Sequence, residues 1–127
     1  MQHEELTKQI IGCAYQVYNT LGSGFLESVY ERSLLIELQT ARLIAQPQVG
    51  LDVYYREFPV GRFFADIIVE DTVIIELKAI EELGKIHEVQ LVNYLVATGK
   101  PIGLLINFGP DGVVVRRKVR ELSMASC

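Results

Sequence analysis

The chain has 127 residues, of which half are hydrophobic and 22% are charged, and its formal net charge is −4. This length suits one domain and leaves little room for two, so we expect residues 1–127 to form a single domain with a substantial core. The composition excludes a disordered chain, and the acidic balance does not favour tight non-specific binding to nucleic acid.

No targeting or membrane segment is predicted. The first residues lack the basic start and apolar run of a signal peptide, and the longest apolar runs are far shorter than a membrane span. We therefore expect a cytoplasmic protein with no membrane contact. The two cysteines, Cys13 and Cys127, are too few for a disulfide framework and have no metal-ligand spacing, so we expect no thiol chemistry.

Helical spacing of apolar residues predicts two helices at the start of the chain. The first covers 4–21 and the second runs from about 26 to about 40, with glycines at 22 and 24 marking the turn between them. Their expected buried stripes are Leu6, Ile10, Cys13, Ala14, Val17 and Leu21 in the first helix, and Leu26, Val29, Tyr30, Leu34 and Leu38 in the second.

Strand patterns then alternate with one more helix. Strict alternation predicts a half-buried strand over 46–55, and residues 59–61 interrupt the pattern before two β-rich runs at 62–69 and 72–78. Helical spacing returns over 86–98, with Val89, Val92 together with Asn93, and Val96 on one side. A continuous apolar run at 102–108 predicts a buried strand, and a last strand begins at 113.

The predicted order is therefore ααβββαββ. It corresponds to an α/β fold in which a mixed central sheet of about five strands is flanked by helices. The basic residues between 116 and 120 are interpreted as a solvated edge strand or tail.

The hairpin between residues 62 and 78 contains the candidate catalytic residues. Glu76 and Lys78 share a strand face because they are two residues apart. A two-residue loop would put Asp66 on the opposite face, whereas a three-residue loop or one bulge sets Asp66 opposite Glu76. We predict the second register, because it keeps the carboxylate out of the core. One face would then carry every charge, with Asp66, Ile68, Ile74, Glu76 and Lys78. The other would be wholly apolar, with Ala65, Ile67, Val69, Val73, Ile75 and Leu77.

Two opposed carboxylates repel each other unless positive charge lies between them. Lys78 supplies part of that charge, and a hard divalent cation with oxygen ligands, such as Mg²⁺, would supply the rest. A metal that polarises a phosphoryl oxygen, with a lysine beside the attacking water, is suited to phosphodiester hydrolysis. An ordinary surface salt bridge among Asp66, Glu76 and Lys78 is the alternative interpretation.

The pattern Asp66 … Glu76-Leu77-Lys78 resembles the PD-(D/E)xK nuclease superfamily, although Ala65 stands where the superfamily name has proline. The segment from Gly24 to Tyr30 resembles the signature of the small bacterial GxxExxY proteins, which are counted within that superfamily. Gln90 and Tyr94 are similar to the Gln-x-x-x-Tyr helix of RecB-like nucleases. The resemblance spans nearly the whole chain and implies a restriction-endonuclease-like core.

The resemblance also implies roles for individual residues. Asp66 and Glu76 would be the principal metal ligands, with the Leu77 carbonyl and the helical acid Glu27 completing the set around Mg²⁺ or, as a substitute, Mn²⁺. Lys78 would position the attacking water or stabilise charge on the phosphate. Gln90 and Tyr94 would face the site, one helical turn apart, whereas the neighbouring His87 is expected to be structural.

These residues predict a metal-dependent nuclease that acts on DNA or RNA, with DNA favoured. The alternative is a non-catalytic module that keeps the nuclease fold and binds nucleic acid or protein. A homodimer is considered as well, because a symmetric pair would present two metal sites to two strands.

Overall fold

The computed structural model describes residues 3–120, which form three helices and one five-stranded sheet. The elements are α1 (Glu4–Leu21), α2 (Glu27–Thr40), β1 (Ala45–Tyr55), β2 (Phe58–Val69), β3 (Val73–Lys78), α3 (Lys85–Thr98), β4 (Ile102–Phe108) and β5 (Val113–Val119). The predicted order of elements is confirmed. The expectation for Cys127 lies outside the described residues.

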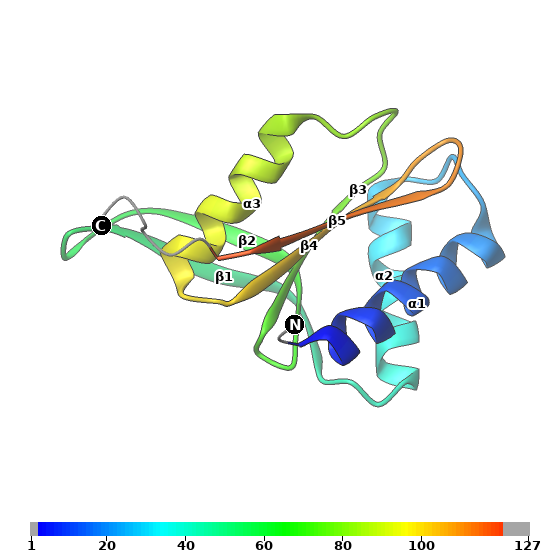
Figure 1. Ribbon diagram of the computed structural model, residues 1–127, viewed down its shortest axis with the longest axis horizontal. Helices are drawn as coiled ribbons and strands as arrows, with labels where there is room; N and C mark the ends of the chain where they lie inside the picture. Colours follow the sequence, from blue (N-terminus) through cyan, green and yellow to red (C-terminus); the bar gives the residue numbers. More distant parts are fainter. Residues whose placement is uncertain (1–2, 121–127) are drawn as a thin grey trace.

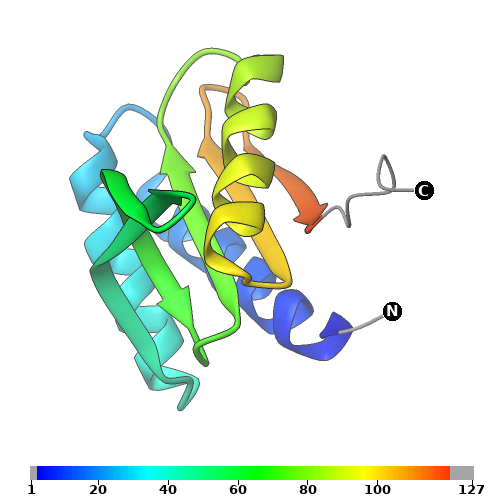
Figure 2. The same ribbon diagram turned by 90° about the vertical axis from the view of Figure 1, so that its left-hand side faces the viewer.

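The sheet is mixed, and its strands follow the chain order β1-β2-β3-β4-β5. Only β3 and β4 are parallel, because α3 lies between them in the sequence and forms a crossover connection. The other neighbours are antiparallel. Helices α1 and α2 cover one face of the sheet and α3 covers the other, as the two views show (Figures 1 and 2).

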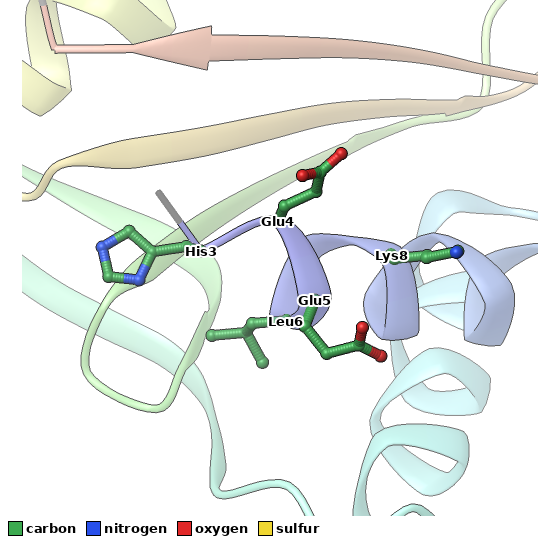
Figure 3. A pocket seen from close by; sticks show the side chains of 5 residues that line it. All are labelled: His3, Glu4, Glu5, Leu6 and Lys8. Carbon is green, nitrogen blue, oxygen red and sulfur yellow. The ribbon is translucent and has the colours of Figure 1, made fainter. Parts of the chain in front are cut away.

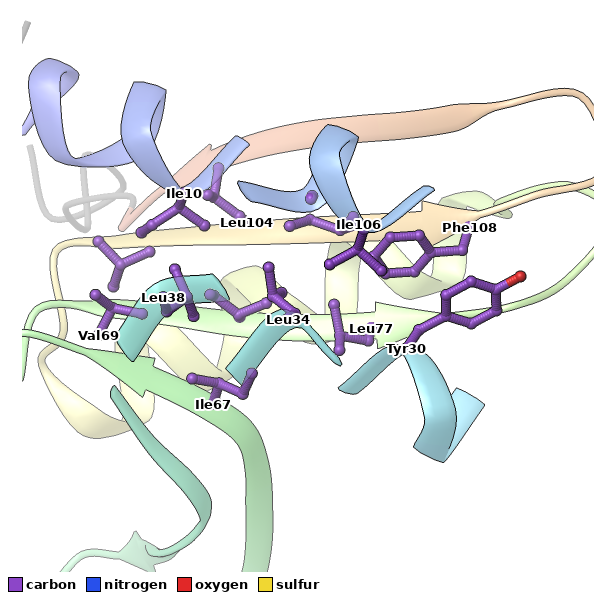
Figure 4. Close-up of a cluster of buried hydrophobic side chains, with 14 of the residues drawn as sticks. Ile10, Tyr30, Leu34, Leu38, Ile67, Val69, Leu77, Leu104, Ile106 and Phe108 are labelled. Atoms are coloured by element: carbon purple, nitrogen blue, oxygen red, sulfur yellow. The ribbon is translucent and has the colours of Figure 1, made fainter. Parts of the chain in front are cut away.

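The larger core lies between the sheet and the first two helices (Figure 4). Its buried residues come from both helices and from β2, β3 and β4: Ile10, Ala14, Val17, Tyr30, Leu34, Leu38, Ile67, Val69, Val73, Ile75, Leu77, Ile102, Leu104, Ile106 and Phe108. The predicted stripes of α1 and α2 are therefore confirmed at their centres. Leu26, at the start of α2, is instead 76% exposed.

The smaller core lies under α3. Leu91 and Leu95 of this helix pack on buried residues of the other sheet face: Ala65, Ile68, Ile74 and Leu105. The valine side of α3 is not its buried side, since Val89 and Val96 are 44% and 54% exposed. Leucines and valines both recur at helical spacing here, so periodicity alone does not decide which side is buried, and the two longer side chains fill the space over the sheet.

Strand β2 begins at Phe58, so the predicted interruption at 59–61 is wrong. Proline lacks the N–H that a ladder needs, but Pro59 lies beside a register shift at Val53 and Tyr54 that accommodates it. The pairing of β1 with β2 is thus much longer than the pairing of β2 with β3.

No helix within residues 3–120 is long and apolar enough to cross a membrane.

The contact between α3 and β4 requires a glycine at position 103. A Cβ atom added to Gly103 would lie 2.8 Å from a Leu91 methyl and 3.0 Å from its Cγ. We expect Gly103→Ala to lower the free energy of unfolding by about 1–3 kcal/mol, because overpacking displaces α3. Gly12→Ala is the control, since nothing lies within 4 Å of its added Cβ in α1. Chemical denaturation should show no loss of stability in the control; equal losses in both would contradict this packing.

Candidate active site

The β2–β3 hairpin has the predicted register. Val69 pairs with Val73 and Ile67 with Ile75, so residues 70–72 form a three-residue loop. Its tightness is supported by the Thr72 N–H, which donates to the Val69 carbonyl at 2.9 Å. Both Glu70 and Asp71 have φ near 53°, a left-handed conformation that Asp adopts more readily than most residues. The register places Asp66 across from Glu76.

Beyond Ile67 and Ile75 the two strands are joined through the acids. The Asp66 N–H donates to Glu76 Oε2 at 3.1 Å, and the Leu77 N–H donates to Asp66 Oδ2 at 2.7 Å. Each carboxylate therefore replaces a main-chain partner across the gap between β2 and β3. These two reciprocal bonds fix both acids at the point where regular pairing stops.

The reason for the gap lies on the other side of β2. The β1–β2 ladder passes from Pro47↔Ile67 to Val49↔Ala65, skipping Gln48 and Asp66, and Gln48 has a φ of 48°. The skip frees the Asp66 N–H for Glu76. It also rotates the strand, because Ala65 packs under α3 whereas Ile67 packs under α1 and α2.

The prediction that Ala65 shares a face with Ile67 is therefore wrong. The rest of the predicted apolar face is confirmed, since its other members all lie in the core under α1 and α2: Ile67, Val69, Val73, Ile75 and Leu77. Ile68 and Ile74 lie on the opposite face, as predicted, and are buried there under α3. Period-two alternation fails where the strand kinks, and irregularities of this kind are frequent beside active sites. Both faces of the central sheet are apolar, and the acids occupy its opened end.

Burial makes the acid pair electrostatically costly. Burial, followed by the neighbouring charge of Asp66, raises the pKa of the Glu76 carboxyl to about 7. Burial also raises the pKa of Asp66, although the Leu77 N–H bond counteracts it. A cation between them would restore the charged forms.

Glu27 joins this acidic group from α2. Burial and the charge of Asp66 raise its pKa, and the charge of Lys78 lowers it. The position of Glu27 is set by Tyr30, one turn later, whose hydroxyl donates to the Gly22 carbonyl at 2.6 Å and whose ring stacks on Phe108 with centroids 4.4 Å apart. Gly24, with φ of 97°, allows the tight connection.

Two polar residues of this region were not predicted. The Gln48 side-chain amide donates to both carboxylate oxygens of Glu31 at 3.0 Å and approaches Asp66 Oδ1 at 3.5 Å. Burial raises the pKa of Glu31, and the charge of Asp66 adds to this. The signal for Glu31 is its position four residues after Glu27, on the same helix face; the position of Gln48 follows only from the kink.

Lys78 ends β3 beside the acids. Its positive charge lowers the pKa values of Asp66, Glu76 and Glu27, so it is the cation that partly offsets the group. In the sheet it is paired with Asn107 of β4. The buried Asn107 amide accepts from the Ile80 N–H at 3.0 Å and donates to the Ile80 carbonyl at 2.9 Å, which fixes the chain just after Lys78.

Comparison with known proteins identifies the family of this chain. A family profile described as the PD-(D/E)XK nuclease superfamily matches residues 4–121. The chain belongs to this superfamily. The sheet and helices accordingly form a restriction-endonuclease-like PD-(D/E)XK fold.

A solved structure supports the same fold. The crystal structure of SSO0001 is similar with a TM-score of 0.61 at 21% identity, and the match covers 98% of this chain. This chain spans 63% of the SSO0001 chain. No curated protein matches the sequence.

PD-(D/E)XK nucleases generally use divalent metals. Within residues 3–120 no three His, Cys, Asp or Glu side chains converge into a complete ligand set. The acid pair nevertheless suits a hard cation, because it offers two half-buried carboxylates whose charge Lys78 only partly offsets. A different hollow of about 740 Å³ at the start of α1 is unsuitable, since the Glu4 and Glu5 carboxylates point in different directions (Figure 3).

The two candidate residues of α3 are not tied to the acids by any hydrogen bond within the described chain. Gln90 is exposed. The Tyr94 ring stacks on the ring of Phe63 with centroids 3.7 Å apart. Phe63 precedes Asp66 by three residues in β2. The catalytic roles of Gln90 and Tyr94 therefore stay predictions. His87 is structural as expected, because its Nδ1 accepts from the Gly84 N–H at 2.9 Å and caps the helix.

The basic residues at 116–120 lie on the edge strand β5 and beyond it, as expected. Lys118 pairs with Glu88 of α3 at 2.6 Å, and Arg116 approaches the same carboxylate at 3.8 Å. These cations bind α3 to the sheet edge. They do not contribute to the acidic group on β2 and β3.

The raised pKa of Glu76 predicts a pH-dependent stability. The folded state holds a proton on Glu76 up to about pH 7, whereas the unfolded chain releases it near 4.5. Stability in the absence of divalent metal should therefore fall as the pH rises through this window, by up to about 3 kcal/mol at about 1.4 kcal/mol per pKa unit. Glu76→Gln keeps an acceptor for the Asp66 N–H and should flatten this dependence. Urea unfolding between pH 5 and 8 measures it; parallel curves for both proteins would contradict the shift.

Proposed function

We propose that this chain is a Mg²⁺-dependent nuclease that hydrolyses phosphodiester bonds, with DNA as the favoured substrate. The observation that carries the proposal is the reciprocal bonding of Asp66 and Glu76 across the opened strands. Such a pair is electrostatically unfavourable in the fold, since burial and mutual repulsion raise the pKa of Glu76 to about 7. A site that gains stability from a divalent cation accounts for its arrangement.

We propose that Asp66 and Glu76 hold the metal. The Leu77 carbonyl is a third ligand in this proposal. The N–H of Leu77 points into the gap toward Asp66. The N–H and C=O of one strand residue point to the same side, so the Leu77 carbonyl faces this gap as well. Glu27 would contribute from α2, directly or through water. When bound, the metal would polarise the phosphoryl oxygen and lower the pKa of a coordinated water.

The remaining roles belong to residues around the acids. Lys78 would orient the attacking water and offset charge on the phosphate, which suits its place at the end of β3. Gln90 and Tyr94 would contact the substrate phosphate or a metal-bound water from α3. The arrangement of Gly24, Glu27 and Tyr30 supports membership of the GxxExxY proteins, because the glycine and tyrosine determine where the acid lies. Residues 1–127 would act as one domain.

The test is cleavage of single- and double-stranded DNA and RNA in Mg²⁺ or Mn²⁺. Asp66→Asn, Glu76→Gln and Lys78→Ala should each lower the rate by at least about a hundredfold, since each removes a metal ligand or a charge acting on the transition state. Lys100→Ala is the matched control, because Lys100 binds Asp71 in the β2–β3 loop, at the opposite end of β3 from Lys78. Equal cleavage by parent and Asp66→Asn would refute the proposal.

Metal binding is tested separately by calorimetry. Mg²⁺ or Mn²⁺ should bind the parent protein, release protons below about pH 7, and fail to bind Glu76→Ala. Tight nucleic-acid binding with no metal-dependent turnover would instead indicate a binding module that keeps the fold.

A further inference from the structure

The β1–β2 pair extends well beyond the rest of the sheet. Strand β2 pairs with β3 only at Ile67, Ile68 and Val69, whereas it pairs with β1 along nearly its whole length. Residues 49–65, called the arm below, therefore project as a two-stranded ribbon (Figure 1). Only one side of its base is covered, where Val49, Leu51 and Phe63 pack under α3.

The uncovered part of the arm is rich in exposed aromatic rings. Tyr54, Tyr55, Phe58 and Phe64 are each between 55% and 69% exposed. A two-stranded ribbon alone is marginally stable in water. Side chains of this kind indicate a surface that a partner covers.

Two arginines lie against these rings. The guanidinium of Arg56 lies 5.5 Å from the Tyr55 ring centroid, and that of Arg62 lies 5.4 Å from the Phe64 ring centroid. Arg62 occupies space that exists only because residue 50 is glycine, since a Cβ on Gly50 would clash with its guanidinium. Its only ion pair in the described chain, with Asp52 at 3.7 Å, is exposed and therefore weak.

The arm leads directly to the acid pair. Arg62 and Phe64 alternate along β2, so they lie on one side of the strand, and Asp66 follows two residues later at the kink. Exposed rings with guanidinium groups over them are the chemistry that stacks unpaired bases. The arm is also electrically balanced, because Asp52 and Glu57 offset Arg56 and Arg62, which favours stacking over the phosphate contacts that duplex binding requires.

We propose that the arm is a stacking platform for unpaired nucleotides, which it leads to the acid pair, so that the substrate class is single-stranded nucleic acid. This inference rests on the proposed nuclease function. A second copy of the chain fits the arm less well. A stable dimer buries about 800 Å² per partner, and the tip of a two-stranded ribbon is a narrow strip on which the Tyr55 ring already lies near the Arg56 guanidinium.

The experiment measures binding without cleavage. The chain has no tryptophan, so Phe58→Trp introduces a single reporter at the tip. In EDTA, oligothymidylate should quench its fluorescence, and a labelled single strand should bind more tightly than the same sequence as a duplex. By the strand register, Tyr54 lies on the same side of the arm as Arg62 and Phe64. The double variant Tyr54→Ala/Phe64→Ala should weaken single-strand binding by at least about fivefold for each ring removed.

Ile36→Ala is the matched control, since Ile36 is 62% exposed on α2 and should leave binding unchanged. Equal single-strand affinity in the parent and the double variant would overturn the inference. So would light scattering that shows a dimer converted to monomer by the double variant with nucleic-acid binding unaltered. EDTA removes catalysis from the binding assay, so the two proposals can fail separately. If the nuclease proposal fails, the protein will bind single strands without metal-dependent cleavage. If the proposal for the arm fails, cleavage will be insensitive to both substitutions.

Discussion

The structure around the candidate site depends on two hydrogen bonds that replace main-chain pairing with carboxylates. Glu76 accepts from the Asp66 N–H, and Asp66 accepts from the Leu77 N–H. The bonds satisfy backbone donors that the opened strands would otherwise leave unpaired, which is costly in a buried region. They also hold the two acids close together in a region where burial and mutual repulsion oppose ionisation. A bound cation would therefore stabilise the charged forms of both acids.

Other parts of the fold hold the acid pair and its neighbours in position. The kink at Gln48 opens the sheet on one side, and Asn107 fixes the chain beyond Lys78 on the other. Tyr30, anchored on Phe108 and on the Gly22 carbonyl, sets the start of α2 and with it Glu27. Hydrophobic packing on both faces of β2 and β3 makes the opening rigid, because neither strand can shift register without moving apolar side chains out of a core.

The sequence predicts the elements well because their patterns are local. It also predicts the pairing of Val69 with Val73, since any other register would bury a carboxylate. It does not predict that Ala65 and Ile67 face opposite ways, because a strand kink is invisible to a period-two pattern. Nor does it distinguish the leucine side from the valine side of α3, which only the packing on β4 decides. Glu31 and Gln48 were missed because their meeting depends on the same kink.

The most direct test of the central claim is the anomalous diffraction of crystals soaked in Mn²⁺. We predict one strong peak between β2 and β3 that is coordinated by carboxylate oxygens of both Asp66 and Glu76, with their bonds to the main chain rearranged. A map in which the two carboxylates keep their hydrogen bonds to the Leu77 and Asp66 N–H groups, with manganese bound elsewhere or not at all, would contradict the account.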